Sequence, residues 1–185
     1  MDLLLDLWLA ILAAGVAVFF CGFISHVVLP LHKKDFDKVP NEDAFLAAMK
    51  QLNTPPGFYF FPQMAMGKEG KDPKNIEAMK SMPMGTMTIW NGMPNMGKNM
   101  LLTFAWNALA SLLIAYLASV TLPRGAEFSR VLQVAGTAGV LAHTIAQMPN
   151  QIWYGAKTST KIACIIDGLL SGVVTGLVFA ALWPK

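Results

Sequence analysis

Three polar side chains within apolar stretches are the residues of this chain that could do chemistry. Asn107, His143 and Asp167 each lie in a block of mostly apolar residues. A carboxylate or an imidazole inside a lipid bilayer is costly and must face protein or water. If each block is a membrane-crossing helix, a rise of about 1.5 Å per residue places all three roughly 8–13 Å below the same membrane surface. The sequence therefore predicts an intramembrane polar layer.

His143 and Asp167 are the titratable members of this layer. An imidazole titrates near neutral pH, so the pair could bind and release protons along a proton or ion path. A structural role is also open, in which the polar groups hydrogen-bond across helices for about 0.6–2 kcal/mol each. In a third interpretation, His143 or His26 is an axial ligand to haem. The supporting polar residues in each case are His26, Ser111, Gln147, Ser171 and Thr175.

Glycines recur beside the polar residues at helical spacing. Gly168, Gly172 and Gly176 repeat every four residues, which places them on one face of a helix. Gly136 and Gly139 share a helix face with the polar side chains that follow them. Faces of this kind let two backbones approach closely. We expect tight helix packing here, either within the chain or against a partner.

Soft metal ligands gather between the first and second apolar blocks. The methionines concerned are Met82, Met84, Met87, Met93 and Met96, preceded by Met64 and Met66. Thioether sulfur favours Cu(I), so copper binding is one prediction. In the alternative interpretation, methionine fills irregular gaps and forms adaptable contact surfaces. Haem and copper are thus the two cofactors that the sequence leaves open.

Four apolar blocks predict the helices that carry these residues. We expect membrane-spanning helices over residues 3–29, 100–122, 131–148 and 162–183. Pro30, Pro123 and Pro149 follow the first three blocks and are expected to end them. The predicted fold class is an all-α integral membrane protein. It is a four-transmembrane-helix bundle with one long loop that carries a short amphipathic surface helix.

The long loop covers residues 31–99 and precedes the three-helix segment 100–185. Asn41 followed by Glu42 and Asp43 is typical of a helix start, and apolar residues at helical spacing extend this amphipathic helix over 41–53. From Met64 to Met100 the sequence has no clear hydrophobic period. We expect irregular structure there, packed against the helices, with a basic linker from Lys68.

The distribution of basic residues predicts an orientation. Four crossings place both termini on one side, which carries only Arg124, Arg130 and Lys185, whereas most lysines lie in the long loop and in the connector 150–161. Positive residues accumulate on the cytoplasmic side. The long loop is therefore predicted to be cytoplasmic, with both termini on the opposite side of a bacterial inner membrane.

Composition excludes several functional classes. The 185 residues are 55% hydrophobic and 14% charged, which is unusual for a soluble domain. The net charge of +3 is spread over loops and forms no basic stripe for nucleic acid. Phosphate-binding, serine-hydrolase and metalloprotease motifs are absent from the sequence. Cys21 and Cys164 have no metal or redox spacing, so we expect no catalytic activity of the chain's own.

These observations favour a small accessory or assembly subunit of a larger membrane complex. Its expected partners are the lipid bilayer and either another membrane protein or a second copy of the chain. The alternative is a proton-coupled transporter or proton-conducting protein that uses Asp167 and His143. A haem- or copper-binding membrane protein is the third possibility.

Overall fold

A computed structural model describes residues 2–63 and 72–185 of the chain. This part is mostly helical and divides into two compact units. The larger unit consists of Met1–Phe36 with Asn95–Lys185, and the smaller one of Asp37–Pro94.

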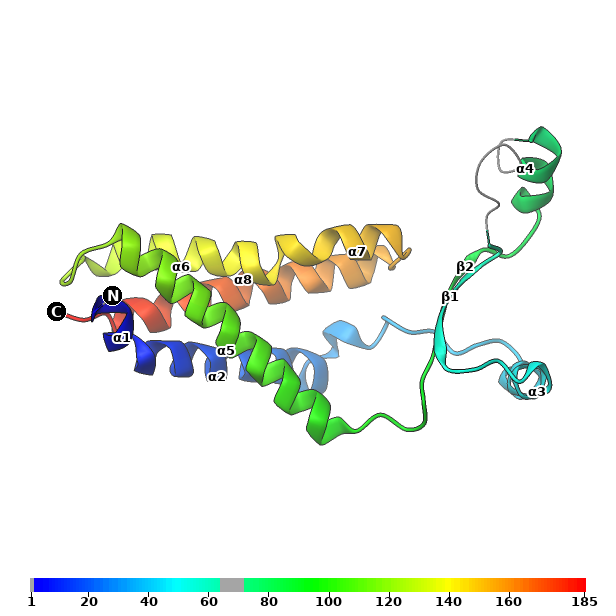
Figure 1. The fold of residues 1–185 in the computed structure, drawn as a ribbon, viewed down its shortest axis with the longest axis horizontal. Coiled ribbons are helices and arrows are strands. Elements are labelled where there is room, and N and C mark those ends of the chain that lie inside the picture. The colour runs from blue at the N-terminus through cyan, green and yellow to red at the C-terminus, as the bar shows by residue number, and fades with distance from the viewer. Residues whose placement is uncertain (1, 64–71) are drawn as a thin grey trace. The chain divides into compact units, whose positions relative to one another are not determined.

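The larger unit is a bundle of helices (Figure 1). Its elements in chain order are α1 (Asp2–Asp6), α2 (Trp8–Phe23), a π-helical turn η1 (Ile24–Val28), a 3-10 turn η2 (Pro30–His32), α5 (Met96–Thr121), α6 (Phe128–His143), a 3-10 turn η4 (Ile145–Gln147), α7 (Met148–Trp153) and α8 (Thr158–Ala181). In Figure 1, α6 and α7 run beside α8, while α5 crosses α2 obliquely.

In the described part of the chain, three helical runs are long and apolar enough to cross a membrane: Trp8–Val28, Met96–Thr121 and Thr158–Ala181. The helix predicted over 131–148 is interrupted, because α6 ends at His143 and the turn η4 separates it from α7. Pro149 lies in the first turn of α7, where its missing N–H is tolerated. The prediction that Pro149 ends this helix is therefore wrong.

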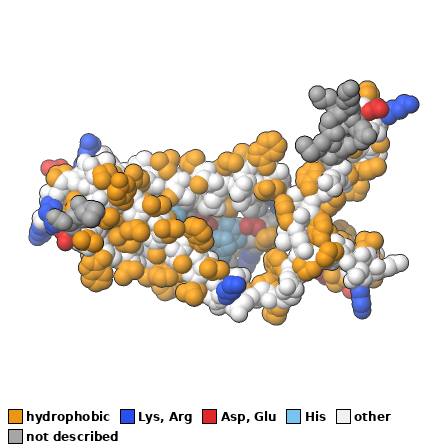
Figure 2. Space-filling view, in the orientation of Figure 1, with side chains coloured by type: hydrophobic (Ala, Val, Ile, Leu, Met, Phe, Trp, Pro, Cys, Tyr) orange, Lys and Arg blue, Asp and Glu red, His pale blue; other side chains and the backbone are white. Residues whose placement is uncertain are grey.

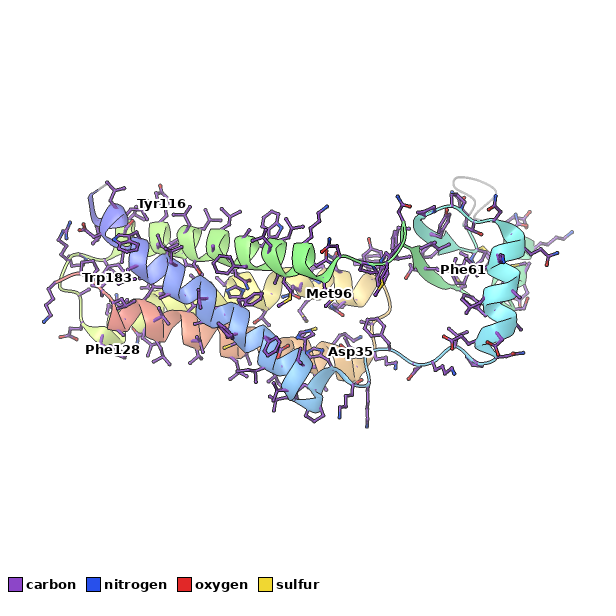
Figure 3. The ribbon with its side chains drawn as sticks, turned by 90° about the horizontal axis from the view of Figure 1, so that it is seen from below. Asp35, Phe61, Met96, Tyr116, Phe128 and Trp183 are labelled. Atoms are coloured by element: carbon purple, nitrogen blue, oxygen red, sulfur yellow. The ribbon has the colours of Figure 1, made fainter. Side chains whose placement is uncertain are left out.

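Small, aliphatic and aromatic side chains form a buried core at one end of the bundle. Its buried members are Leu7, Ala10, Ala14, Ile114, Ala115, Ala118, Leu122, Val131, Ala135, Phe179, Ala180 and Trp183. The indole N–H of Trp183 donates to the carbonyl oxygen of Pro123 at 3.0 Å, which fixes the last turn of the chain. Phe128 and Trp183 lie at this end, whereas Asp35 and Met96 lie at the other (Figure 3).

The glycines of α6 and α8 meet each other within the chain. These two helices form the most extensive contact between any two elements of the described chain. A Cβ atom added at Gly172 would lie 2.6 Å from the backbone nitrogen of Val140, and one at Gly176 would lie 2.8 Å from the Cα of Gly136. Both distances are too short for a side chain. Glycine is therefore what permits the close approach of the two backbones.

The outer surface of the bundle is largely apolar, as Figure 2 shows for one face. Large side chains such as Trp8, Leu12, Trp106 and Leu113 are exposed. An apolar surface of this extent is unusual on a soluble monomer and suits a lipid environment. The described part of the chain is thus mostly helical and compatible with a membrane environment.

Within its described residues, the smaller unit contains two helices and one antiparallel pair of strands. Its elements are α3 (Glu42–Leu52), β1 (Gly57–Phe61), α4 (Pro73–Lys80) and β2 (Gly85–Ile89). The strands pair from Gly57 opposite Ile89 to Phe61 opposite Gly85. The expectation of irregular structure from Met64 to Met100 is therefore wrong over α4, β2 and the start of α5, and the fold is not purely helical. Residues 64–71, which include Met64, Met66 and Lys68, lie outside the described residues.

Candidate functional site

Two carboxylates hold one histidine at the end of the bundle opposite the apolar core. His32 places Nδ1 2.6 Å from Oδ2 of Asp35 and Nε2 2.8 Å from Oδ2 of Asp167. Since a carboxylate accepts hydrogen bonds, both ring nitrogens act as donors in this arrangement. All three side chains are largely shielded from solvent. The histidine therefore connects the segment after α2 with the middle of α8.

The backbone after α2 brings His32 to this position. The π-helical turn η1 widens the end of the helix, and Leu29 is extended. Pro30 then starts η2, where a proline is tolerated because the first N–H groups of a turn need no partner. The chain thereby folds back beside α8 instead of leaving the bundle. π-Helical turns are frequent at functional sites.

Each carboxylate has a second, fixed partner. The hydroxyl of Ser25, in η1, donates to Oδ1 of Asp167 at 2.5 Å. The hydroxyl of Thr160, in the first turns of α8, donates to Oδ1 of Asp35 at 2.9 Å. These bonds leave Oδ2 of each carboxylate turned toward the ring of His32.

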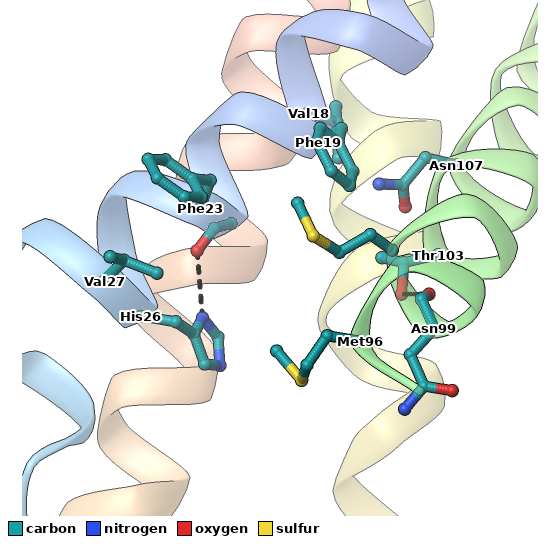
Figure 4. Close-up of a pocket in the computed structure, with 11 residues that line it drawn as sticks. Val18, Phe19, Phe23, His26, Val27, Met96, Asn99, Thr103 and Asn107 are labelled. Carbon is teal, nitrogen blue, oxygen red and sulfur yellow. Dashed lines mark hydrogen bonds between the residues drawn. The ribbon is translucent and has the colours of Figure 1, made fainter. Parts of the chain in front are cut away.

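A second histidine stacks on the first. The rings of His26 and His32 are 3.8 Å apart between centroids and almost parallel, at 8°. The Nδ1–H of His26 donates to the carbonyl oxygen of Gly22 at 3.0 Å, which leaves Nε2 as the available nitrogen (Figure 4). One ligand atom each of His26, His32 and Asp167 lies within 4.8 Å of the others.

The charges of this cluster favour its ionised form. Burial lowers the pKa of His32, but hydrogen bonds to Asp35 and Asp167 and their negative charges outweigh this effect and raise it above its usual value. Burial raises the pKa of Asp35, but hydrogen bonds from His32 and Thr160 and the nearby positive charge bring it below its usual value. Both shifts favour a charged imidazolium beside the carboxylate of Asp35.

This donor set matches a transition-metal site. Two imidazole nitrogens and one carboxylate oxygen are ligands for Zn²⁺, Fe²⁺ and related ions. A ligating histidine usually donates its other N–H to a carboxylate or a backbone carbonyl. His32 does so to Asp35, and His26 does so to Gly22. The proton that His32 directs at Asp167 occupies the place where an ion would bind.

A polar cavity of about 200 Å³ adjoins the cluster. The predicted polar layer lies on its wall, because Asn107, His143 and Asp167 all line it. The same wall includes His26, Cys164, Gln147 and Ser171. Three helices therefore direct polar side chains into one space beside the histidine cluster.

The predicted pair of His143 and Asp167 does not form. Nε2 of His143 is buried without a hydrogen-bond partner among the described residues, and the partners of Asp167 are His32 and Ser25. The side-chain amide of Gln147 donates to the backbone oxygen of His143, at 2.7 Å. Binding of haem by His143 or His26 stays a prediction.

The other predicted site residues have structural surroundings. Ser111 and Thr175 are buried, and the Thr175 hydroxyl donates to the carbonyl oxygen of Ser171 at 2.7 Å. A Cβ atom at Gly139 would lie 2.9 Å from the Cα of Gly172, and one at Gly168 would lie 2.7 Å from the backbone oxygen of His143. Thr175 and the glycines belong to the α6–α8 contact and its continuation toward the cavity, whereas Ser111 lies in α5.

The methionines divide between the two units. Met82, Met84 and Met93 are exposed in the smaller unit, and Met87 lies in β2. Met96 belongs to the larger unit, where it lines a separate cavity. Copper binding by these residues stays a prediction.

Four residues of the cluster are not predicted from the sequence: Ser25, His32, Asp35 and Thr160. From the sequence, the segment after Pro30 is predicted to be a charged helix end at the membrane surface. The one local signal is the spacing of His32 and Asp35, which places both side chains on one side of a helical turn. The hydrogen bond between His32 and Asp167 joins residues 135 positions apart, so no local sequence pattern indicates it.

Comparison of the chain with known protein families, with curated proteins and with solved structures finds no match.

Proposed function

We propose that this protein is a membrane metal-binding protein that holds one divalent transition-metal ion between His26, His32 and Asp167. The observation that supports it is the pattern of hydrogen bonds around the two imidazoles. Both Nδ1–H groups have oxygen partners, and one ligand atom each of His26, His32 and Asp167 lies within 4.8 Å of the others. Asp35 orients His32 without touching the ion.

The proposed centre keeps a coordination position open. Three protein ligands leave room for water or a small ligand, as in catalytic rather than structural zinc sites. His26 and Asp167 also line the polar cavity, so the open position faces that cavity. The ion would polarise whatever small polar molecule enters. Nitrogen and oxygen donors favour Zn²⁺, Fe²⁺ or Co²⁺ over Cu(I).

The test is metal titration of the purified protein after chelator treatment. We expect one Co²⁺ or Zn²⁺ per chain, with visible absorption for Co²⁺. In His26→Ala, His32→Ala and Asp167→Asn the affinity should fall by at least tenfold. His143→Gln is the matched control, because this histidine lines the cavity without belonging to the cluster. Wild-type protein that binds no ion, or ligand variants that bind like the control, would refute the proposal.

A second candidate function is that of an accessory or assembly subunit, and the smaller unit favours it. Leu52, Trp90 and Met93 there are 71%, 66% and 94% exposed. Apolar groups gathered on so small a unit are typical of an interaction surface. Gentle extraction of the native membrane and mass spectrometry should find a stoichiometric membrane partner, lost in Trp90→Ser with Met93→Ser. A chain that migrates alone contradicts this role and leaves the metal centre unaffected.

In either role we place the chain in the membrane with four crossings. The fourth is α6 with η4 and α7, which runs beside α8 (Figure 1). The distribution of lysines favours a cytoplasmic smaller unit and termini on the opposite side, as in a bacterial inner membrane. Reporter fusions at Lys185 and within 37–94 should report opposite sides.

A further inference from the structure

A second, larger cavity opens between α2 and α5. Its volume is about 440 Å³, within the range of sites for small organic ligands. The residues that line it are Val18, Phe19, Gly22, Phe23, His26, Val27, Met96, Asn99, Met100, Thr103 and Asn107. Figure 4 shows aromatic and aliphatic side chains of α2 and η1 facing α5 across an open space.

This cavity continues into the polar one. Val18, Gly22, His26, Thr103 and Asn107 line both. The combined space has an apolar end, formed by phenylalanine, valine and methionine, and a polar end beside the histidine cluster. A molecule that fills both ends must be amphiphilic.

The polar groups at the junction point to an uncharged head. Among the described residues that line the larger cavity there is no Lys, Arg, Asp or Glu. The Thr103 hydroxyl donates to the carbonyl oxygen of Asn99 at 2.9 Å, so its oxygen remains an acceptor. The amide of Asn107 is directed across the gap toward α2 (Figure 4) and offers both a donor and an acceptor.

The neighbouring charges disfavour an anionic head. Asp167, on the polar wall, already receives hydrogen bonds from His32 and Ser25. Among the described residues, no Lys or Arg lines either cavity, so a carboxylate that enters would find no basic side chain to replace its hydration. Neutral carbonyl or hydroxyl groups carry no such penalty.

We propose that the joined cavities bind a single-tailed lipid with a small uncharged head that bears carbonyl or hydroxyl oxygens. The tail lies between α2 and α5, against Phe19, Phe23 and Met100. The head lies at Asn107 and Thr103. The molecule enters sideways from the bilayer, where such amphiphiles reside, and it needs no metal ion in order to bind.

Gly22 provides a direct way to block the tail position. A Cβ atom added there meets nothing within 4 Å, so the side chain of Gly22→Leu begins in the free space of the cavity. Val16→Leu is the matched control, because Val16 lies on the same helix and is 42% exposed on its outer surface. Asn107→Leu removes the proposed contact with the head.

The experiment is native mass spectrometry of the full chain released from nanodiscs after titration with monocaprin or decanoate. The two probes share a ten-carbon acyl tail and differ in head charge. We expect monocaprin to bind at least tenfold more tightly than decanoate, and Gly22→Leu and Asn107→Leu each to weaken it at least tenfold. Val16→Leu should bind as wild type does. Undiminished monocaprin binding in Gly22→Leu, or equal binding of both probes, would overturn the proposal.

Metal titration of Asn107→Leu keeps the two proposals separate. Asn107 supplies no ligand to the histidine cluster, so metal affinity should be retained in this variant. Monocaprin binding without metal binding would refute the metal centre alone. Metal binding without monocaprin binding would refute the lipid site alone.

Discussion

Asp35 does not contact the proposed ion; it hydrogen-bonds His32, which does, and is therefore a positioning residue. Its carboxylate fixes the ring orientation and keeps Nε2 directed at Asp167. Loss of such a partner typically weakens metal binding about 10–100-fold. We predict this loss for Asp35→Asn, measured by competition with a chelator of known affinity.

The controls for this variant separate charge from orientation. Asp43→Asn removes one negative charge in the smaller unit, and its metal affinity should equal that of wild type. The ion-to-chain ratio of Asp35→Asn should remain one, because all three ligands are still present. An unchanged affinity in Asp35→Asn would show that His32 needs no carboxylate behind it.

Unlike Asp35, Ser111 has a polar side-chain atom that makes no hydrogen bond to the described residues. Its side chain is fully buried, and its hydroxyl has no hydrogen-bond partner among the described residues. A buried unsatisfied polar group costs about 1–3 kcal/mol. Ser111→Ala should therefore leave the stability unchanged or raise it by about 1 kcal/mol. Thermal unfolding in detergent measures this, and a clear loss of stability would reveal a partner for the hydroxyl.

At the scale of elements, the contact between α6 and α8 has no room for a methyl group. A Cβ atom at Gly172 would meet the backbone of Val140, which cannot rotate away. Overpacking of this kind costs typically about 1–3 kcal/mol. We predict this destabilisation for Gly172→Ala, measured by thermal or denaturant unfolding in detergent.

Gly22→Ala is the control for the same substitution in a helix with free space. No atom lies within 4 Å of the added Cβ, and alanine favours a helix over glycine by up to about 1 kcal/mol. Its stability should equal or exceed that of wild type. Equal effects at Gly172 and Gly22 would mean that the helices shift apart without penalty.

The apolar segments predict the helices because the length of an apolar stretch sets the length of a membrane helix. The blocks at 100–122 and 162–183 correspond to α5 and α8, although both helices begin four residues earlier. Asn95 explains one of these shifts: its side chain caps α5 by accepting from the N–H of Lys98 at 2.9 Å, so the polar first turn belongs to the helix. Hydropathy cannot detect such a cap.

The features that the sequence does not predict depend on contacts between segments that are far apart along the chain. β1 is a short aromatic run whose partner, β2, lies beyond α4, so neither strand shows a hairpin signal of its own. His32 belongs to the site only because η1 and η2 turn it toward α8. The residues that the sequence does indicate, Asn107, His143 and Asp167, share a cavity, but the partner of Asp167 could not be identified from them.

At the scale of the whole molecule, all proposed ligands belong to one compact unit. His26, His32 and Asp167 lie in the larger unit, and the smaller unit, Asp37–Pro94, contributes none. We predict that replacing 37–94 by a flexible Gly/Ser linker of about 20 residues, with a span of roughly 25 Å, preserves membrane insertion and metal affinity. Chelator competition checks the latter.

The same deletion tests the accessory role independently. If the smaller unit carries the partner-binding surface, the shortened chain should bind the ion and lose its partner. A shortened chain that inserts but no longer binds the ion would show that the smaller unit supports the site.

Because of the π-helical turn Ile24–Val28, the geometry of the site depends on the exact number of residues in this turn. Such a turn contains one residue more than an α-helical turn, and each residue of an α-helix advances the direction of a side chain by about 100°. Deletion of one codon within 24–28 would restore a regular helix and rotate the residues that follow the deletion, His32 among them, relative to α2, while leaving the apolar core of the bundle in place.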